Sequence, residues 1–214
     1  MKRRFLGQWL VSLTVAALGV ALTGGARAAD EAPDVMIKRL SEDVIGTIKA
    51  DKTLQTGDIS RVIALVDSKI MPNVNFQRMT ASAVGPAWRQ ATPEQKKQLQ
   101  DEFKTLLVRT YAGALAQVND QSISVKPLRA DAADTEVIVR TEVRGRGDPI
   151  QLDYRLEKAP GQGTGWKIFN LNVLGVWLVE TYRSQFAQEI NAKGLDGLIA
   201  TLSARNKSNS AKKG

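Results

Sequence analysis

Residues 136–157 read EVIVRTEVRGRGDPIQLDYRLE. On both sides of the segment 145–149, apolar side chains alternate with polar or charged ones, and this period of two is typical of β-strands with one buried and one solvated face. Glycine and proline between the two runs indicate a turn. The stretch therefore predicts two antiparallel strands joined by a hairpin. Their shared apolar face would carry Val137, Val139, Thr141 and Val143 from the first strand, and Ile150, Leu152, Tyr154 and Leu156 from the second.

Two further strands flank this hairpin. Residues 122–126 alternate apolar and polar side chains, which predicts a strand before it. Residues 166–177 are apolar at both parities, so we expect one long strand that bends near Gly175. One parity holds Ile168 and Val176, and the other holds Val173. The expected sheet is antiparallel and has four strands.

Helices precede the sheet. Apolar residues recur at helical spacing over 34–50, and Asp58 can cap a short helix that follows. Another short helix ends at Gly85-Pro86 and carries Phe76, Met79, Ala83 and Val84. Thr92-Pro93-Glu94-Gln95 is a capping-box pattern, and it predicts a long amphipathic helix over 93–117. The apolar stripe of that helix consists of Leu99, Phe103, Leu106, Leu107, Thr110, Tyr111 and Ala114.

Helices also follow the sheet. One stripe is formed by Val179, Tyr182, Phe186 and Ile190. Lys193-Gly194 would end this helix, and a short helix would then run to Leu202. The order of helices, antiparallel strands and helices predicts an α+β fold. Helices must cover the apolar face of the sheet, and the faces that meet there either fill a solid core or wall a cavity. Periodicity does not separate these two alternatives.

The two ends of the chain differ from its middle. A basic start, an uncharged run from Phe5 to Ala26 and a small-x-small ending predict a secretory signal peptide over 1–28, cut after Ala28. The alternative is an uncleaved membrane anchor. Residues 203–214 are polar and basic, and we expect a disordered tail there. A single domain, 29–202, lies between these segments.

The composition excludes several classes of function. The 214-residue chain contains neither Cys nor His, which excludes disulfides, thiol nucleophiles and the commonest general base. Its formal net charge of +8 falls to +4 when the four cations of 1–28 are removed. Four more cations lie in the tail, so the body is close to neutral and nucleic acid is not an expected partner.

An enzyme would have to use Glu136, Asp153 and Glu157. All three fall on the charged face of the hairpin, where a cross-strand charge ladder with Arg140 and Arg155 explains them better. The sequence has no nucleophile elbow, P-loop or metal-binding spacing. We therefore expect no catalytic residue, no metal and no cofactor, and the alternatives are a ligand carrier or a ligand-free adaptor.

Residues 166–186, WKIFNLNVLGVWLVETYRSQF, resemble the last strand and following helix of the MlaC-type periplasmic phospholipid-binding proteins, also called the toluene-tolerance (Ttg2) family. Further motifs of that family are matched, in the same order, by 72–79 (PNVNFQRM), 88–95 (WRQATPEQ) and 194–199 (GLDGLI). The resemblance covers roughly residues 35–202. Leu174 and Trp177 depart from it, because many members carry an acidic residue and a serine at these positions.

The resemblance implies a curved sheet of the NTF2-like (nuclear-transport-factor) or cystatin-like type. This sheet would pack against an N-terminal helical subdomain and C-terminal helices and enclose a lipid cavity. The implied activity is that of a monomeric periplasmic carrier with a phospholipid ligand. Its implied partners are an inner-membrane ABC-transporter complex with an MCE-type hexamer and an outer-membrane lipoprotein–porin complex. Shuttling between them would maintain the lipid asymmetry of the outer membrane.

A cavity for acyl chains needs apolar walls without buried charge. The inward faces described above carry no charged side chain. The candidate lipid-binding residues of the helices are Phe76, Met79, Val84, Trp88, Phe103, Leu106, Leu107, Thr110, Tyr111, Val179 and Tyr182. Those of the strands are Val137, Val139, Thr141, Ile150, Leu152, Tyr154, Ile168, Val173 and Val176.

Overall fold

The computed structural model describes residues 31–131 and 133–211. The signal peptide expected over 1–28 lies outside the described residues, and so do residues 212–214 of the expected tail.

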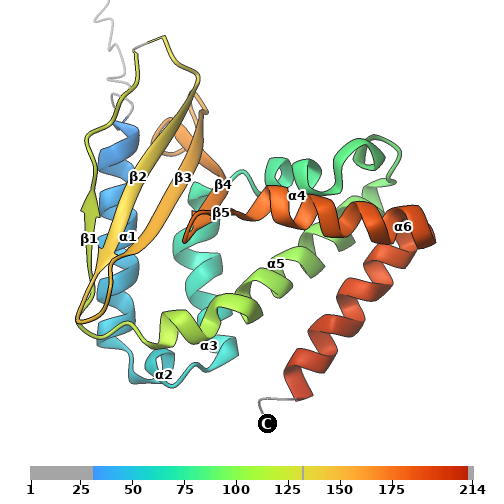
Figure 1. Cartoon of the computed structure of the whole chain (residues 1–214), viewed down its shortest axis with the longest axis horizontal. Coiled ribbons are helices and arrows are strands. Elements are labelled where there is room, and N and C mark those ends of the chain that lie inside the picture. The colour runs from blue at the N-terminus through green and yellow to red at the C-terminus, as the bar shows by residue number, and fades with distance from the viewer. Residues whose placement is uncertain (1–30, 132, 212–214) are drawn as a thin grey trace, which may run out of the picture.

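An antiparallel sheet forms one half of the fold (Figure 1). Its five strands are adjacent in chain order: β1 (Ser122–Val125), β2 (Glu136–Arg144), β3 (Ile150–Lys158), β4 (Trp166–Val173) and β5 (Val176–Trp177). The predicted hairpin is confirmed, because Val139 pairs with Tyr154 and both belong to the expected apolar face. The four-strand prediction is wrong. Leu174 and Gly175 have φ of +53° and +86°, which makes a two-residue hairpin turn, so the last two residues of the expected long strand fold back as β5.

A β-bulge also changes which side chains share a face of β4. Arg155 pairs with Asn170 and Leu156 with Ile168, so Phe169 has no partner on β3. The extra residue reverses the alternation, and Ile168 therefore lies on the same face as Val173 although their parities differ. The expectation that these two residues face opposite ways is wrong for this reason.

The helices form two groups around the sheet (Figure 1). They are α1 (Pro33–Ala50), α2 (Lys52–Gln55), α3 (Ile59–Leu65), α4 (Phe76–Val84), α5 (Pro93–Ala116) and α6 (Leu178–Ala211). One π-helical turn, η1 (Val66–Ile70), and two 3₁₀ turns, η2 (Met71–Asn73) and η3 (Gly85–Arg89), connect them. Helix α1 packs on the apolar face of the sheet through Met36, Ile37 and Leu40. Helices α4, α5 and α6 form a second group beside β4 and β5, which we call the helical half.

The predicted capping box at the start of α5 is confirmed. The backbone N–H of Gln95 donates to the Thr92 hydroxyl at 3.2 Å, and the N–H of Thr92 donates to the Gln95 side-chain oxygen at 3.0 Å. The amide nitrogen of Gln95 also donates to Asp196 at 2.7 Å. The start of α5 is thereby tied to the C-terminal part of the chain.

Helix α6 is broken at Gly194, as the sequence predicts, because this glycine has non-helical angles of φ 70° and ψ −174°. The second part continues to Ala211, so the prediction of a disordered tail is wrong for residues 203–211. The reason is packing: Leu198 and Leu202 are buried against the helical half, and the side chain of Asn206 donates to the backbone carbonyl of Glu102 at 2.9 Å. The basic composition of residues 203–211 gave no indication that α5 provides a surface against which this segment packs.

The break in α6 leads to a prediction about Gly197. A Cβ at this position would lie 2.1 Å from the Cβ of Lys193, because the chain folds closely on itself after Gly194. Gly197→Ala should therefore lower the free energy of unfolding by about 1–3 kcal/mol. Gly113→Ala, in α5, is the matched control, since its Cβ would meet nothing within 4 Å and should add about 0.5–1 kcal/mol. Urea unfolding of both variants measures these changes in the free energy of unfolding. If both variants were stabilised, or both destabilised, the prediction would be wrong.

Candidate functional site

The apolar face of the sheet is shared between two packing partners. Near the start of β2 and β4, Val137, Val139 and Ile168 are buried under α1. Further along β4, Leu171 and Val173 pack against the helical half instead. Leu152 lies directly beside Val173 on β3. The apolar surface thus passes from α1 to the helical half along one continuous face.

The centre of the helical half is a packed aromatic core. Phe103 on α5 has no exposed surface. Its ring centroid lies 5.8 Å from that of Phe76, 5.0 Å from that of Tyr182 and 5.2 Å from that of Phe186. The sequence left a solid core and a cavity as alternatives, and the centre of the helical half is a solid core. The candidate residues buried in this cluster are Phe76, Met79, Val84, Phe103, Leu106, Val179 and Tyr182.

Other candidate residues lie around this core and keep part of their surface exposed. Leu107 and Tyr111 on α5, Trp88 on η3 and Val173 on β4 pack against the buried cluster but are only half-buried. Leu152 and Tyr154 on β3 are half-buried as well. We define the apolar rim by five residues of α5 and the sheet. Four of them pack around the buried cluster, namely Leu107, Tyr111, Leu171 and Val173, and the fifth, Leu152, pairs with Val173.

Three candidate residues are not in the interior. Thr110 is exposed, and its hydroxyl donates to the Leu106 carbonyl of its own helix. Ile150 is 44% exposed and Val176 51% exposed, although the sequence places both on the inward face. Ile150 is the first residue of its strand, and Val176 lies in a two-residue edge strand, so no helix covers either one. Thr141 is buried, and its backbone N–H donates to Asp153 at 3.2 Å.

Two tyrosines near the apolar face, Tyr111 and Tyr154, have a raised pKa. Burial raises the pKa of Tyr111, and the neighbouring Tyr182 acts in the same direction. Burial also raises the pKa of Tyr154 to about 12, against a hydrogen bond with Ser41 that lowers it. Neither group therefore introduces a charge beside the apolar rim.

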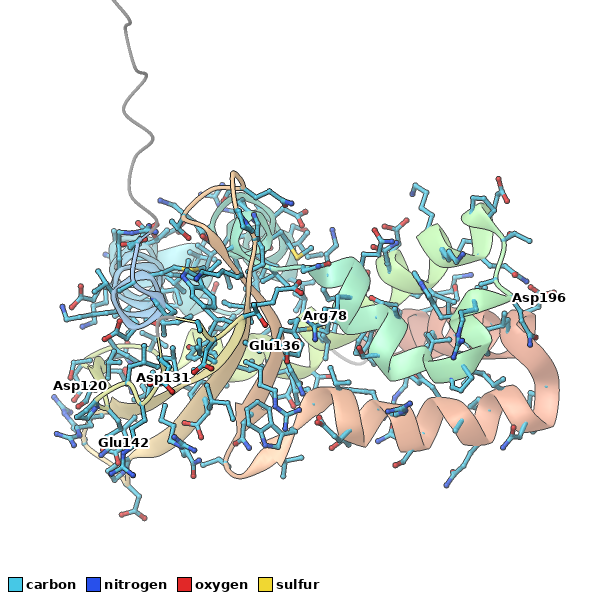
Figure 2. The ribbon with its side chains drawn as sticks, turned by 90° about the horizontal axis from the view of Figure 1, so that it is seen from above. Arg78, Asp120, Asp131, Glu136, Glu142 and Asp196 are labelled. Carbon is cyan, nitrogen blue, oxygen red and sulfur yellow. The ribbon has the colours of Figure 1, made fainter. Side chains whose placement is uncertain are left out.

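The three carboxylates of the enzymatic alternative are already engaged. Arg78 of α4 forms ion pairs with both Glu136 and Glu157, and its guanidinium lies 3.6 Å from the ring centroid of Phe169. Figure 2 shows Arg78 and Glu136 together at the junction of the sheet with the helical half. Asp153 is buried and accepts from Thr141 N–H. Glu136 and Glu157 thus pair with Arg78 of α4 and do not form the charge ladder expected within the sheet.

A second polar cluster holds the start of α6 against the sheet. The side-chain oxygen of Asn170 accepts from the Val179 N–H at 3.1 Å and so caps the helix, while its amide donates to Glu180 at 2.8 Å. Glu180 also pairs with Arg155, whose guanidinium lies 4.0 Å from the Trp177 ring centroid. Neither cluster could be predicted from the sequence, because a helical or strand period gives no information about partners so far away in the chain.

This second cluster predicts a dependence of stability on pH. Burial alone would raise the pKa of Glu180, but hydrogen bonds from Asn170 and Arg155 outweigh it and hold the pKa below its ordinary value. A carboxylate with a lowered folded-state pKa stabilises the fold above its unfolded pKa, and this contribution is lost as the pH falls through the folded-state value. The free energy of unfolding of the native chain should therefore exceed that of Glu180→Gln by up to about 1 kcal/mol at pH 7. This difference should become smaller below about pH 4.5.

Chemical unfolding between about pH 7 and pH 3 measures this difference. Arg155→Met is the matched variant, because it removes the other half of the same ion pair. It should lose the part of the pH dependence that Arg155 supplies, while Asn170 still donates to Glu180. A difference between the native chain and Glu180→Gln that stayed constant over the whole range would contradict the assignment.

Within the described residues, no group of three or more acidic side chains could hold a metal ion. None of the helices described is long and apolar enough to span a bilayer. A surface depression of about 470 Å³ lies in the loop between β1 and β2. It is lined by Leu128, Arg129, Ala130, Asp131 and Asp134, and contains none of the candidate residues.

The profile of the MlaC protein family matches residues 38–204. The chain belongs to the MlaC family. Toluene tolerance protein Ttg2D of Pseudomonas putida is 27% identical over 169 residues, which are 78% of this chain and 77% of that protein. The intermembrane phospholipid transport system binding protein MlaC of Haemophilus influenzae is 22% identical over 199 residues, or 92% of each chain. The family resemblance drawn from the sequence motifs is thereby confirmed.

A solved structure that is similar to this chain contains a ligand. The phospholipid-binding protein of Ralstonia solanacearum, in complex with a phospholipid, is 48% identical to this chain. The match covers 83% of this chain and 98% of the other, with a TM-score of 0.79. The α+β fold described above is therefore shared with a protein that binds a phospholipid.

Proposed function

We propose that this protein is a periplasmic phospholipid carrier of the MlaC family. It takes phospholipid from one membrane system and delivers it to another. Its partners are an inner-membrane ABC-transporter complex with an MCE-type hexamer and an outer-membrane lipoprotein–porin complex, and its role is to maintain outer-membrane lipid asymmetry. The observation that carries the proposal is the phospholipid complex of the Ralstonia solanacearum protein, which is 48% identical over nearly its whole length.

The acyl chains would lie against the apolar rim, where the sheet meets the helical half. Exposing a methylene group to water costs about 0.8 kcal/mol, so a carrier has to supply a surface without charge. The rim meets this condition: its residues are apolar or, at Tyr111, held neutral by burial. The packed core around Phe103 would form the floor beneath the acyl chains, and the ion pairs of Arg78 lie on the other, polar face of the sheet.

The proposed periplasmic location rests on the signal-peptide pattern of residues 1–28. Export with a signal peptide over 1–28, followed by cleavage after Ala28, would release the domain into the periplasm. Because the chain has no cysteine, it cannot form disulfides in that oxidising compartment. N-terminal sequencing of protein from the cell envelope tests the location: we expect Ala29 as the first residue, and an intact Met1 in the membrane fraction would contradict it.

The carrier function is tested by native mass spectrometry and lipid extraction of gently purified protein. We expect bound phospholipid, and we expect Leu107→Asp, in the apolar rim, to lose it. Gln98→Asp on the same helix is the matched control, because it introduces the same side chain and the same change of charge at an exposed position. An empty native protein that takes no phospholipid from vesicles would overturn the proposal and favour a ligand-free adaptor.

A further inference from the structure

Three large apolar residues are exposed together at one end of the sheet. Leu174 is 65% exposed, Val176 51% and Ile150 44%. They are neighbours through the backbone, because the Leu174 N–H donates to the carbonyl of Gln151 at 3.0 Å and Val176 pairs with Val173. We call Ile150, Leu174 and Val176 the apolar tip.

Leu174 is an unusual residue for its backbone position. Among the described residues other than glycine it alone has a positive φ, of 53°. Glycine, asparagine and aspartate adopt this left-handed conformation with the least strain. Leucine at this position therefore neither relieves backbone strain nor buries its side chain. A strained backbone that presents an apolar group to solvent indicates a use outside the fold itself.

The apolar tip is continuous with the proposed acyl-chain site. Val176 lies beside Val173, which lies beside Leu152, and both of these residues belong to the apolar rim. A molecule of phospholipid that leaves the rim along β4 would pass the apolar tip before it reached water. The tip thus lies at the point where cargo and membrane have to meet.

We propose that the apolar tip inserts into the surface layer of a phospholipid bilayer and docks the protein there while cargo is exchanged. The proposal rests on the carrier function. A bilayer fits this surface because its acyl region has the same chemistry as the cargo, and docking keeps the acyl chains out of water during transfer. Two arginines next to the tip are already paired: Arg144, the last residue of β2, with Glu142, and Arg146, in the β2–β3 turn, with Asp120. Docking should therefore depend on apolar insertion and not on anionic lipid.

The test uses Leu174→Asn in the mature protein. Asparagine suits the left-handed conformation, so the variant should fold at least as well as the native chain. Val35→Asn is the matched control, because Val35 is also 51% exposed. It lies at the other end of β4: the chain just before it, at Glu31, bonds to Thr164 in the β3–β4 loop. The eight residues of β4 place the two sites roughly 25 Å apart.

Flotation with phosphatidylcholine vesicles measures docking, and uptake of a fluorescent phospholipid from the same vesicles measures exchange. For Leu174→Asn we expect vesicle binding and the initial rate of uptake to fall by about tenfold, because one leucine no longer inserts. The amount of phospholipid that co-purifies should not change. Val35→Asn should match the native chain, and salt between about 50 and 500 mM should have little effect.

The remaining outcomes of these measurements separate the docking proposal from the carrier function. Unchanged vesicle binding by Leu174→Asn would overturn the docking proposal and leave the carrier function intact. Loss of co-purified phospholipid would place Leu174 in the cargo site and also overturn it. Binding that requires anionic lipid and disappears in salt would identify electrostatic adsorption in place of insertion. A native protein that binds vesicles but never carries lipid would refute the carrier function while the docking result stood.

Discussion

Phe103→Ala should lower the free energy of unfolding by about 3–5 kcal/mol. The side chain is fully buried on α5, and its ring contacts three other aromatic rings, those of Phe76, Tyr182 and Phe186. Removing it deletes these contacts and leaves a cavity that α4, α5 and α6 cannot close without moving. Urea unfolding monitored by circular dichroism measures the loss, and a domain of ordinary stability would be close to unfolding.

Thr110→Ala is the control for Phe103→Ala on the same helix. Thr110 is exposed, and its hydroxyl bonds only to the carbonyl of Leu106 one turn earlier. Its replacement should change stability by no more than about 0.5 kcal/mol. If Phe103→Ala also cost less than about 1 kcal/mol, the aromatic cluster would not be the packed core of the helical half.

Val176→Glu should weaken phospholipid binding while the protein remains folded, because Val176 pairs with Val173 of the apolar rim. Because Val176 is 51% exposed, its carboxylate stays hydrated in the empty protein, and the free energy of unfolding should change by no more than about 0.5 kcal/mol. A carboxylate next to Val173, at the border of the apolar rim, in contrast opposes acyl chains that lie against this rim. Because half of the Val176 side chain is exposed, we expect phospholipid binding to weaken by about tenfold. Thermal melting and mass spectrometry of bound lipid on one sample measure both effects.

Val35→Glu is the matched control, since this residue of α1 has the same exposed fraction of 51% and does not adjoin the apolar rim. It should keep both its stability and its phospholipid. Global unfolding of Val176→Glu would mean that the side chain is buried in a solid core, contrary to its exposure. A folded Val176→Glu protein with a full lipid load would remove Val176 from the binding site.

The parts of the fold that depend on neighbours in the chain could be predicted. The capping box from Thr92 to Gln95 and the break at Gly194 arise within a few residues, so their side chains alone specify them. The β2–β3 hairpin is also local, because one turn and a period of two set its register. For the same reason the buried half of the candidate site, from Phe76 to Tyr182, could be read from helical stripes.

The rest depended on packing between distant segments. The bulge at Phe169 depends on how β4 pairs with β3, and the helix over 203–211 depends on a surface that α5 supplies. Arg78 could not be assigned a partner from the sequence, because Glu157 is 79 residues away and no period links them.

By itself, the sequence determined the α+β class, the apolar faces of the helices and of the β2–β3 hairpin, and the family of this protein. Side-chain order sets local conformation through steric and hydrogen-bonding preferences that act over a few residues. Only the tertiary structure decided which of those faces are covered. It buried Phe103, left the apolar rim half-exposed and presented Leu174 to solvent. Burial is a property of all the segments that surround a side chain, and these come together only when the sheet and the helical half pack against each other.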